Sequence, residues 1–177
     1  MADPAAPSPS PGIAAGLLRR LAALNYEALL VTAVLFVAGF ALAPFVSPRP
    51  AGVPNALIVP RAGPRQIAFV AFVTLLGAYF VWFWSEGRQT LAQKTWRIVL
   101  ARAGGGALTR RAAFVRYLAC WAGPFIALAA YLLLRPFGLG AYAVWLVALN
   151  WLWAMVDPDR QFLHDRIACT RLLVAAP

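Results

Sequence analysis

The residues most able to do chemistry are a charged pair at the start of an apolar run. Glu27 lies within the run from Leu21 to Phe45, which is long enough to cross a bilayer, and Arg20 directly precedes this run. A carboxylate in hydrocarbon costs at least about 2.5 kcal/mol on insertion scales, so it needs a partner or a function. Because the two residues are two helical turns apart, we expect them on one helix face, about 10 Å apart along the axis.

Glu27 has two interpretations that the residues leave open. As a structural group it would pair with Arg20, Arg116 or Arg166 and lock the helices together. As a functional group it would exchange a proton, since burial favours the neutral acid and a nearby guanidinium favours the carboxylate. The elements that hold these side chains therefore decide the matter.

The composition is that of an integral membrane protein. Of 177 residues, 62% are hydrophobic and only 12% are charged, and the mean hydropathy is +0.71, which excludes ordinary soluble domains. This length suits one small bundle. The net charge of +10 falls mostly between the apolar runs, so we expect a lipid bilayer as partner and no nucleic acid.

The predicted fold is all-α, a bundle of four transmembrane helices within residues 17–173. Residues 1–16, rich in Pro, Ala and Ser, are predicted to be a disordered tail, and the first apolar run is too long for a cleaved signal peptide. Gly123 and Pro124 are candidates for a hinge or for close helix packing. The four runs that meet the length for a span are Leu21 to Phe45, Gln66 to Trp84, Ala112 to Leu134, and Gly138 to Val156.

The distribution of basic residues predicts the orientation. Of the 16 Lys and Arg residues, 11 lie in the amino-terminal tail, in residues 85–111 and after Val156, and four lie on the opposite side. The positive-inside rule then places both termini and the middle loop in the cytoplasm of a multi-pass protein of the cell (inner) membrane. The loop from Ser47 to Arg65 contains five prolines and should be irregular and external.

The middle loop contains a segment whose secondary structure the hydrophobic pattern does not decide. Residues 90–100 place Leu91, Trp96, Val99 and Leu100 among polar residues. With a period of 3.6 this is a short amphipathic helix on the cytoplasmic membrane surface, and with a period of two it is a strand.

Three segments resemble the RDD family of membrane proteins, named for one arginine and two aspartates. They are RRLAALNYEALL, FWSEGRQTLAQKTWRIVL and DRQFLHDRIACTRLL, and the likeness extends from about Leu18 to Leu172. The resemblance implies that Arg20 is the family's arginine, that Glu27 occupies the first aspartate position and that Asp165 is the later aspartate. Glu27 is one methylene longer than aspartate, and Ala92 and Cys169 stand where glycines are usual.

Arg20, Glu27 and Asp165 are thus the predicted charged cluster. Asp165 is expected to cap the short helix of the tail or to bridge to Arg20, and His164 is expected to be solvated or capping. No catalytic residue, metal site or cofactor is expected, because one histidine beside one aspartate lacks the supporting groups. The candidate supporting residues are Arg116, Arg166, Gln89 and Thr90.

The resemblance implies transport, including the ion and proton exchange proposed for some members. The alternative is a structural or accessory protein that docks a larger membrane complex and transports nothing. An enzyme is the weakest hypothesis, because the chain shows no activated nucleophile, metal set or phosphate loop. A homo-oligomer or a larger membrane complex would fit either of the first two.

Overall fold

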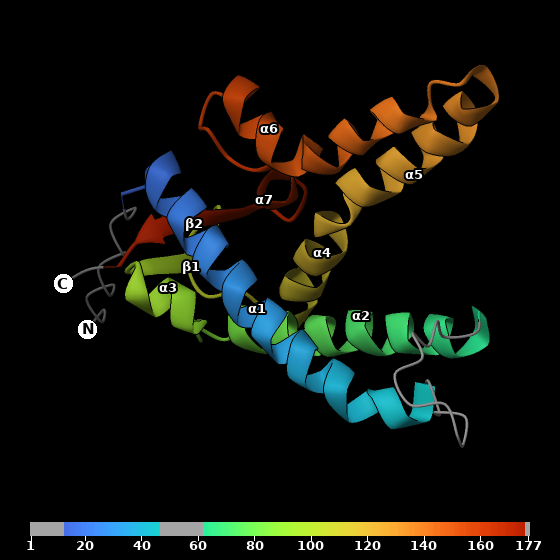
Figure 1. Ribbon diagram of the computed structural model, residues 1–177. Helices are drawn as coiled ribbons and strands as arrows, with labels where there is room; N and C mark the ends of the chain where they lie inside the picture. The colour runs from blue at the N-terminus through green and yellow to red at the C-terminus, as the bar shows by residue number, and fades with distance from the viewer. Residues whose placement is uncertain (1–12, 47–61, 176–177) are drawn as a thin grey trace, which may run out of the picture.

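The computed structural model describes residues 13–46 and 62–175 and shows a mostly helical protein (Figure 1). Two long helices, α1 (Leu17–Val46) and α2 (Ala62–Trp84), pack against each other. The proline-rich loop between them, residues 47–61, and residues 1–12 of the predicted disordered tail lie outside the described residues.

Three helical stretches are long and apolar enough to span a membrane. They are Leu17–Phe45, Gly63–Trp84 and Arg110–Phe137, which contain the first three predicted spans. The third consists of α4 (Arg110–Cys120), α5 (Ala122–Leu134) and η1 (Arg135–Phe137). The predicted fourth span corresponds to a shorter apolar stretch, Gly140–Val156, made of the 3₁₀-helix η2 (Gly140–Ala148) and α6 (Leu149–Val156).

The predicted all-α class is wrong in one respect, because a two-stranded antiparallel sheet joins the middle loop to the C-terminal tail. Strand β1 (Ile98–Arg102) pairs with β2 (Thr170–Val174), and Leu100 stands opposite Leu172. Residues 90–100 therefore contain both predicted elements, the short helix α3 (Leu91–Thr95) followed by β1. Between β2 and α6 lies α7 (Leu163–Ile167).

The residues just before α1 join the end of the molecule that holds β1 and β2, which we call the sheet end. Ala14 bridges to Leu173, the Ala15 N–H donates to the Leu172 carbonyl at 2.9 Å, and Ala15 is buried. The predicted disordered tail is thus wrong for residues 13–16, which are tied to β2. The beginning of α1, the middle loop and the C-terminal strand consequently lie at the same end of the helices (Figure 1).

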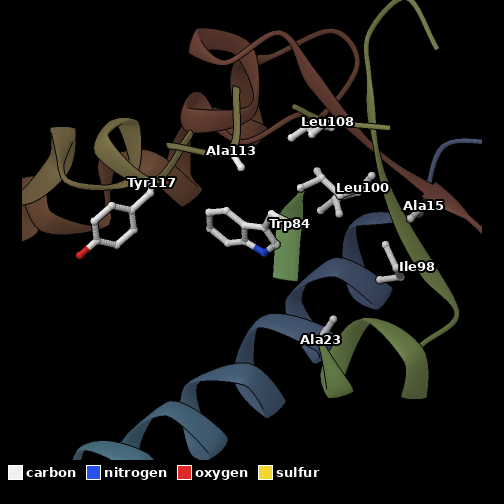
Figure 2. Packing of buried hydrophobic residues seen from close by; sticks show 9 residues of the cluster. Ala15, Ala23, Trp84, Ile98, Leu100, Leu108, Ala113 and Tyr117 are labelled. Atoms are coloured by element: carbon white, nitrogen blue, oxygen red, sulfur yellow. The ribbon is translucent and has the colours of Figure 1, made fainter. Parts of the chain in front are cut away.

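A hydrophobic core fills this end of the molecule (Figure 2). Trp84 at the end of α2 and Tyr117 of α4 contribute its largest side chains, and Ile98 and Leu100 of β1 add to it. Away from this core the helices expose large apolar side chains, as expected of surfaces in contact with lipid. Figure 1 shows α5 and η2 diverging from α1 and α2 beyond α4.

The third span is interrupted at Trp121, and Pro124 explains the break. Proline has no N–H, so Pro124 leaves the carbonyl of Cys120, four residues earlier, without its helical hydrogen bond. The side-chain amide of Asn150 supplies the missing donor, with its Nδ2 2.7 Å from the Cys120 oxygen. A side chain from a neighbouring helix is a usual way to satisfy such a carbonyl in a membrane.

Gly123 allows η2 to approach this break closely. A Cβ on Gly123 would stand 2.6 Å from the Val147 carbonyl oxygen and 3.1 Å from that of Leu146. Both neighbours are backbone atoms, so the contact requires glycine. Close packing, one of the two predicted roles of Gly123, is confirmed.

Gly123→Ala should destabilise the protein by about 1 to 3 kcal/mol, because the backbone of η2 would have to move away. Gly39→Ala is the matched control, since its Cβ would make only an ordinary contact, 3.7 Å from the ring of Phe72. Thermal unfolding in detergent, followed by size-exclusion chromatography, compares the two variants. Equal melting temperatures would contradict the packing argument.

Because Asn150 bonds to the carbonyl that Pro124 leaves free, we predict that substitutions at positions 150 and 124 have non-additive effects on the free energy of unfolding. Asn150→Leu should cost about 1 to 3 kcal/mol, because it leaves the Cys120 carbonyl unsatisfied. Pro124→Ala restores an N–H at position 124, so the same Asn150→Leu change should cost clearly less in that background. A double-mutant cycle on unfolding free energies measures the difference, and additive effects would show that Asn150 does not serve the proline break.

Candidate functional site

A cavity of about 510 Å³ lies between the α1–α2 pair and the part formed by α4, α5 and α6. Its walls are mostly apolar, with aromatic side chains from α2 and α4, and its polar groups come from five elements. One face of α1 borders it, because the contributing positions repeat every three or four residues as one stripe of a helix does. These positions are Arg20, Ala23, Leu24, Glu27 and Val31.

Arg20 and Glu27 lie on one helix face, as predicted, and both border this cavity, but Glu27 pairs with no arginine of the described residues. Its Oε1 accepts a hydrogen bond from the Tyr79 hydroxyl at 2.9 Å, and its Oε2 accepts one from the Thr90 hydroxyl at 2.5 Å. Among the described residues, no Lys or Arg nitrogen lies within 4.0 Å of this carboxylate. Glu27 is half-buried.

Thr90 can hold Glu27 because it begins α3. Its Oγ1 accepts from the Gln93 N–H, and the Gln93 side chain accepts from the Thr90 N–H, which is a capping box. Since the Thr90 oxygen accepts at the cap, its own proton is available to the carboxylate. The supporting role predicted for Thr90 thus has a structural basis, whereas Gln89 donates to the Ile98 carbonyl at 3.1 Å.

Arg116 and Asp165 form the buried ion pair of the site. Arg116 donates from Nε and Nη2 to Asp165 Oδ1 at 3.0 and 2.8 Å, and the Thr170 hydroxyl donates to the same oxygen at 3.0 Å. The guanidinium carbon lies 4.0 Å above the ring of Trp84. Asp165 is fully buried and Arg116 almost so, and the predicted bridge from Asp165 to Arg20 is replaced by this pair.

His164 lines the cavity beside this pair and is buried, so the predicted solvated histidine is wrong. Its Nε2 stands 3.1 Å from Arg116 Nη2. Because a guanidinium can only donate, Nε2 must accept and the ring proton must sit on Nδ1. The neutral ring also stacks on Phe162, with centroids 5.6 Å apart.

Burial sets the protonation of His164, and charge pairing sets that of Asp165. Burial lowers the pKa of His164 to about 4, and Arg116 acts in the same direction while Asp165 opposes it. Burial would raise the pKa of Asp165, but the charge of Arg116, helped by its hydrogen bonds and that of Thr170, holds this pKa below its ordinary value. The pair is therefore ionised at neutral pH and the imidazole is neutral.

Arg20 is also buried, with 3% of its surface exposed. Its Nη1 donates to the Arg160 carbonyl at 2.9 Å, and its Nε makes no hydrogen bond to any described residue. No carboxylate oxygen in the described segments lies within 4.0 Å of it, although Asp165, Asp157 and Asp159 are close enough for their charges to act on it. Arg20 thus brings to the cavity a positive charge that three carboxylates influence from a distance but that forms no ion pair with a described residue.

Arg166, another predicted supporting residue, lies outside this cluster. It pairs with Asp157 and Asp159 at 2.7 and 2.8 Å, and Asp157 also accepts from the N–H groups of Asp159 and Gln161. This pairing holds the pKa of Asp157 below its ordinary value. The turn after α6 is stabilised in this way.

The sequence interpretation missed two residues of the site, Tyr79 and Asn150, and misjudged His164. Tyr79 stands among aromatic residues that resemble an interfacial belt, so nothing local marks it as a partner of Glu27. Asn150 is the only amide within its apolar run, and a polar residue inside a span is a signal that could have identified it. Within residues 13–46 and 62–175, no three His, Cys, Asp or Glu side chains gather as a metal would require.

The family model of the RDD family matches residues 14–169, which is most of the chain. The chain belongs to the RDD family. No curated protein and no solved structure matches it. Of the residues predicted to occupy the three RDD positions, Glu27 bonds to Tyr79 and Thr90, Asp165 pairs with Arg116, and Arg20 bonds to the Arg160 carbonyl.

The stability of this RDD protein should fall as the pH drops from about 6.5 to about 4. An imidazole whose pKa is lowered by folding must be neutral in the native state, so the unfolded chain binds the proton more readily throughout this range. The loss should reach about 3 kcal/mol. The contribution of Asp165 disappears only at lower pH, because its pKa lies below the ordinary value.

Melting temperatures in detergent between pH 7 and pH 4 test this, with His164→Gln as the comparison. The variant should be less sensitive to pH over this range, while wild type and variant should both lose stability at still lower pH. Identical pH profiles for the two proteins would show that His164 titrates normally.

Proposed function

We propose that this RDD protein carries protons, or ions coupled to protons, across the cell membrane, and that Glu27 exchanges the proton. The observation that carries the proposal is the environment of Glu27, a carboxylate in a candidate membrane span that borders a cavity and is bound by two hydroxyl groups. Transport through a membrane commonly depends on such intramembrane carboxylates.

Hydroxyl partners suit proton exchange better than an arginine would. Tyr79 can donate to a carboxylate or accept from a carboxylic acid, so its bond to Glu27 can persist in both protonation states. An arginine only donates, and neutralising its partner would leave a buried charge unpaired. Glu27 can therefore gain or lose a proton while the Arg116–Asp165 pair stays intact.

We propose four spans, with the fourth formed by η2 and α6. This stretch is shorter than the others in residues, but a 3₁₀-helix rises about 2.0 Å per residue and an α-helix about 1.5 Å. Nine residues of η2 and eight of α6 then extend about 30 Å, which is the thickness of the hydrocarbon core.

We also propose that the sheet end faces the cytoplasm. The start of α1, the middle loop with α3 and β1, and the C-terminal β2 lie together there. They belong to the segments that hold 11 of the 16 basic residues, which supports a cytoplasmic position for both termini and for the amphipathic middle segment. Proton uptake by Glu27 would then occur near this side.

Proton flux into reconstituted vesicles with a pH-sensitive dye inside tests the function. We expect flux from wild type under an imposed gradient, and background flux from Glu27→Gln, which keeps the size and much of the hydrogen bonding but cannot titrate. Glu86→Gln is the matched control, because Glu86 lies outside the candidate spans and is a solvent-exposed carboxylate that pairs with Arg88 and Arg110. Absence of flux in wild type, or unchanged flux in Glu27→Gln, would refute the proposal.

An accessory role is the second candidate, and the Arg116–Asp165 pair favours it. This pair joins α4 to α7 and could serve only to order the surface at the sheet end for a partner or a second copy of the chain. Recovery with a larger membrane assembly in mild detergent, together with absent flux, would favour this role.

A further inference from the structure

The proposed proton exchange gives no role to Arg20, whose buried charge forms no ion pair with a described residue. Arg20 is 3% exposed. Among the described residues, its guanidinium bonds only to one neutral carbonyl and has no carboxylate oxygen within 4.0 Å. Arg116, which is also buried, has an ion pair, an imidazole and an aromatic ring around it. On Arg20 the carboxylates of Asp165, Asp157 and Asp159 act only from beyond 4.0 Å. A buried charge without a directly bonded partner is costly, so an anion is expected beside Arg20.

The space next to Arg20 defines what kind of anion fits. On one side is the cavity of about 510 Å³, whose walls include Leu24, Val31, Leu76 and Phe80. On the other is a smaller cavity of about 280 Å³ at the start of α1, next to Arg160 and Asp159. A small inorganic anion would leave the larger, apolar cavity empty, whereas a molecule with an acidic head and a hydrocarbon tail would fill it.

We propose that this cavity binds one anionic membrane lipid, with its acidic headgroup at Arg20 and an acyl chain along the apolar walls toward Val31 and Pro124. Lipid is the source because the cavity lies between helices long and apolar enough to be immersed in it. Glu27 does not prevent binding at Arg20, since it lies two turns further along α1 and both its oxygens are engaged by Tyr79 and Thr90.

This site is independent of the proposed proton exchange, because it depends on Arg20 and on the shape of the cavity while exchange depends on Glu27. Lipid binding without flux, or flux without lipid binding, would therefore separate the two proposals.

Native mass spectrometry and thermal unfolding of the full chain in mild detergent test the site. The probes are phosphatidylglycerol and phosphatidylcholine with identical acyl chains, and soluble glycerol phosphate as a head without a tail. We expect one phosphatidylglycerol per chain, bound about tenfold more tightly than phosphatidylcholine, with a matching rise in melting temperature. Glycerol phosphate should give no such rise.

Arg20→Gln should abolish the preference for the anionic lipid. Arg19→Gln is the matched control. Arg19 is the exposed neighbour of Arg20 on the same helix, and its substitution removes the same amount of charge. Val31→Trp fills the apolar part of the cavity while keeping every charge, and it should weaken binding of both lipids. This variant still tests the site if Arg20→Gln does not fold.

Three results would overturn the proposal. They are equal binding of the two lipids, equal loss of the preference in Arg19→Gln and Arg20→Gln, and a lipid-free dimer in which a second copy of the chain fills the cavity. Saturation by glycerol phosphate alone would assign the site to a soluble anion and would also reject a lipid.

Discussion

The structure depends on compensating one buried guanidinium, that of Arg116. Trp84 shields its charge from water on one face, and Asp165, 49 positions further along the chain, balances that charge. Breaking such a pair leaves an uncompensated charge and typically costs about 3 to 5 kcal/mol. Because α4 contributes the cation, α7 the anion and α2 the ring, this contact fixes the third span relative to the second and to the C-terminal segment that pairs with the middle loop.

The rest of the site follows from how this contact is arranged. With Asp165 committed to Arg116 and Thr170, Arg20 loses the acidic partner that the family's charged positions suggest for it. Glu27 in turn binds two hydroxyl groups and pairs with no cationic side chain in residues 13–46 and 62–175. Arg116 and Asp165 are therefore paired, while the carboxylate of Glu27 and the guanidinium of Arg20 border the same cavity without an ion pair to a described residue. The proposed proton exchange and the proposed lipid binding rest on these two residues.

Local periodicity accounts for the parts of the site that the sequence predicted. Arg20 and Glu27 share a face of α1 because seven residues make two turns whatever the helix packs against. Contacts between distant segments could not be predicted from periodicity. Neither the bond between Glu27 and Thr90, 63 positions apart, nor the pairing of β1 with β2 produces a periodic pattern in the sequence. His164 was misjudged for the same reason, because its burial depends on α4 and not on its own short helix.

By itself the sequence determined that the chain is a membrane protein of the RDD family with at least three helices able to span, because hydrophobic length and motif order are properties of the chain alone. It also determined that Arg20 and Glu27 face one side. Only the tertiary structure decided the partners of each charge, the sheet that joins the middle loop to the tail, and the cavity between the helix pairs. Those features arise where segments far apart in the chain meet, and buried charges take whichever compensating groups that meeting provides.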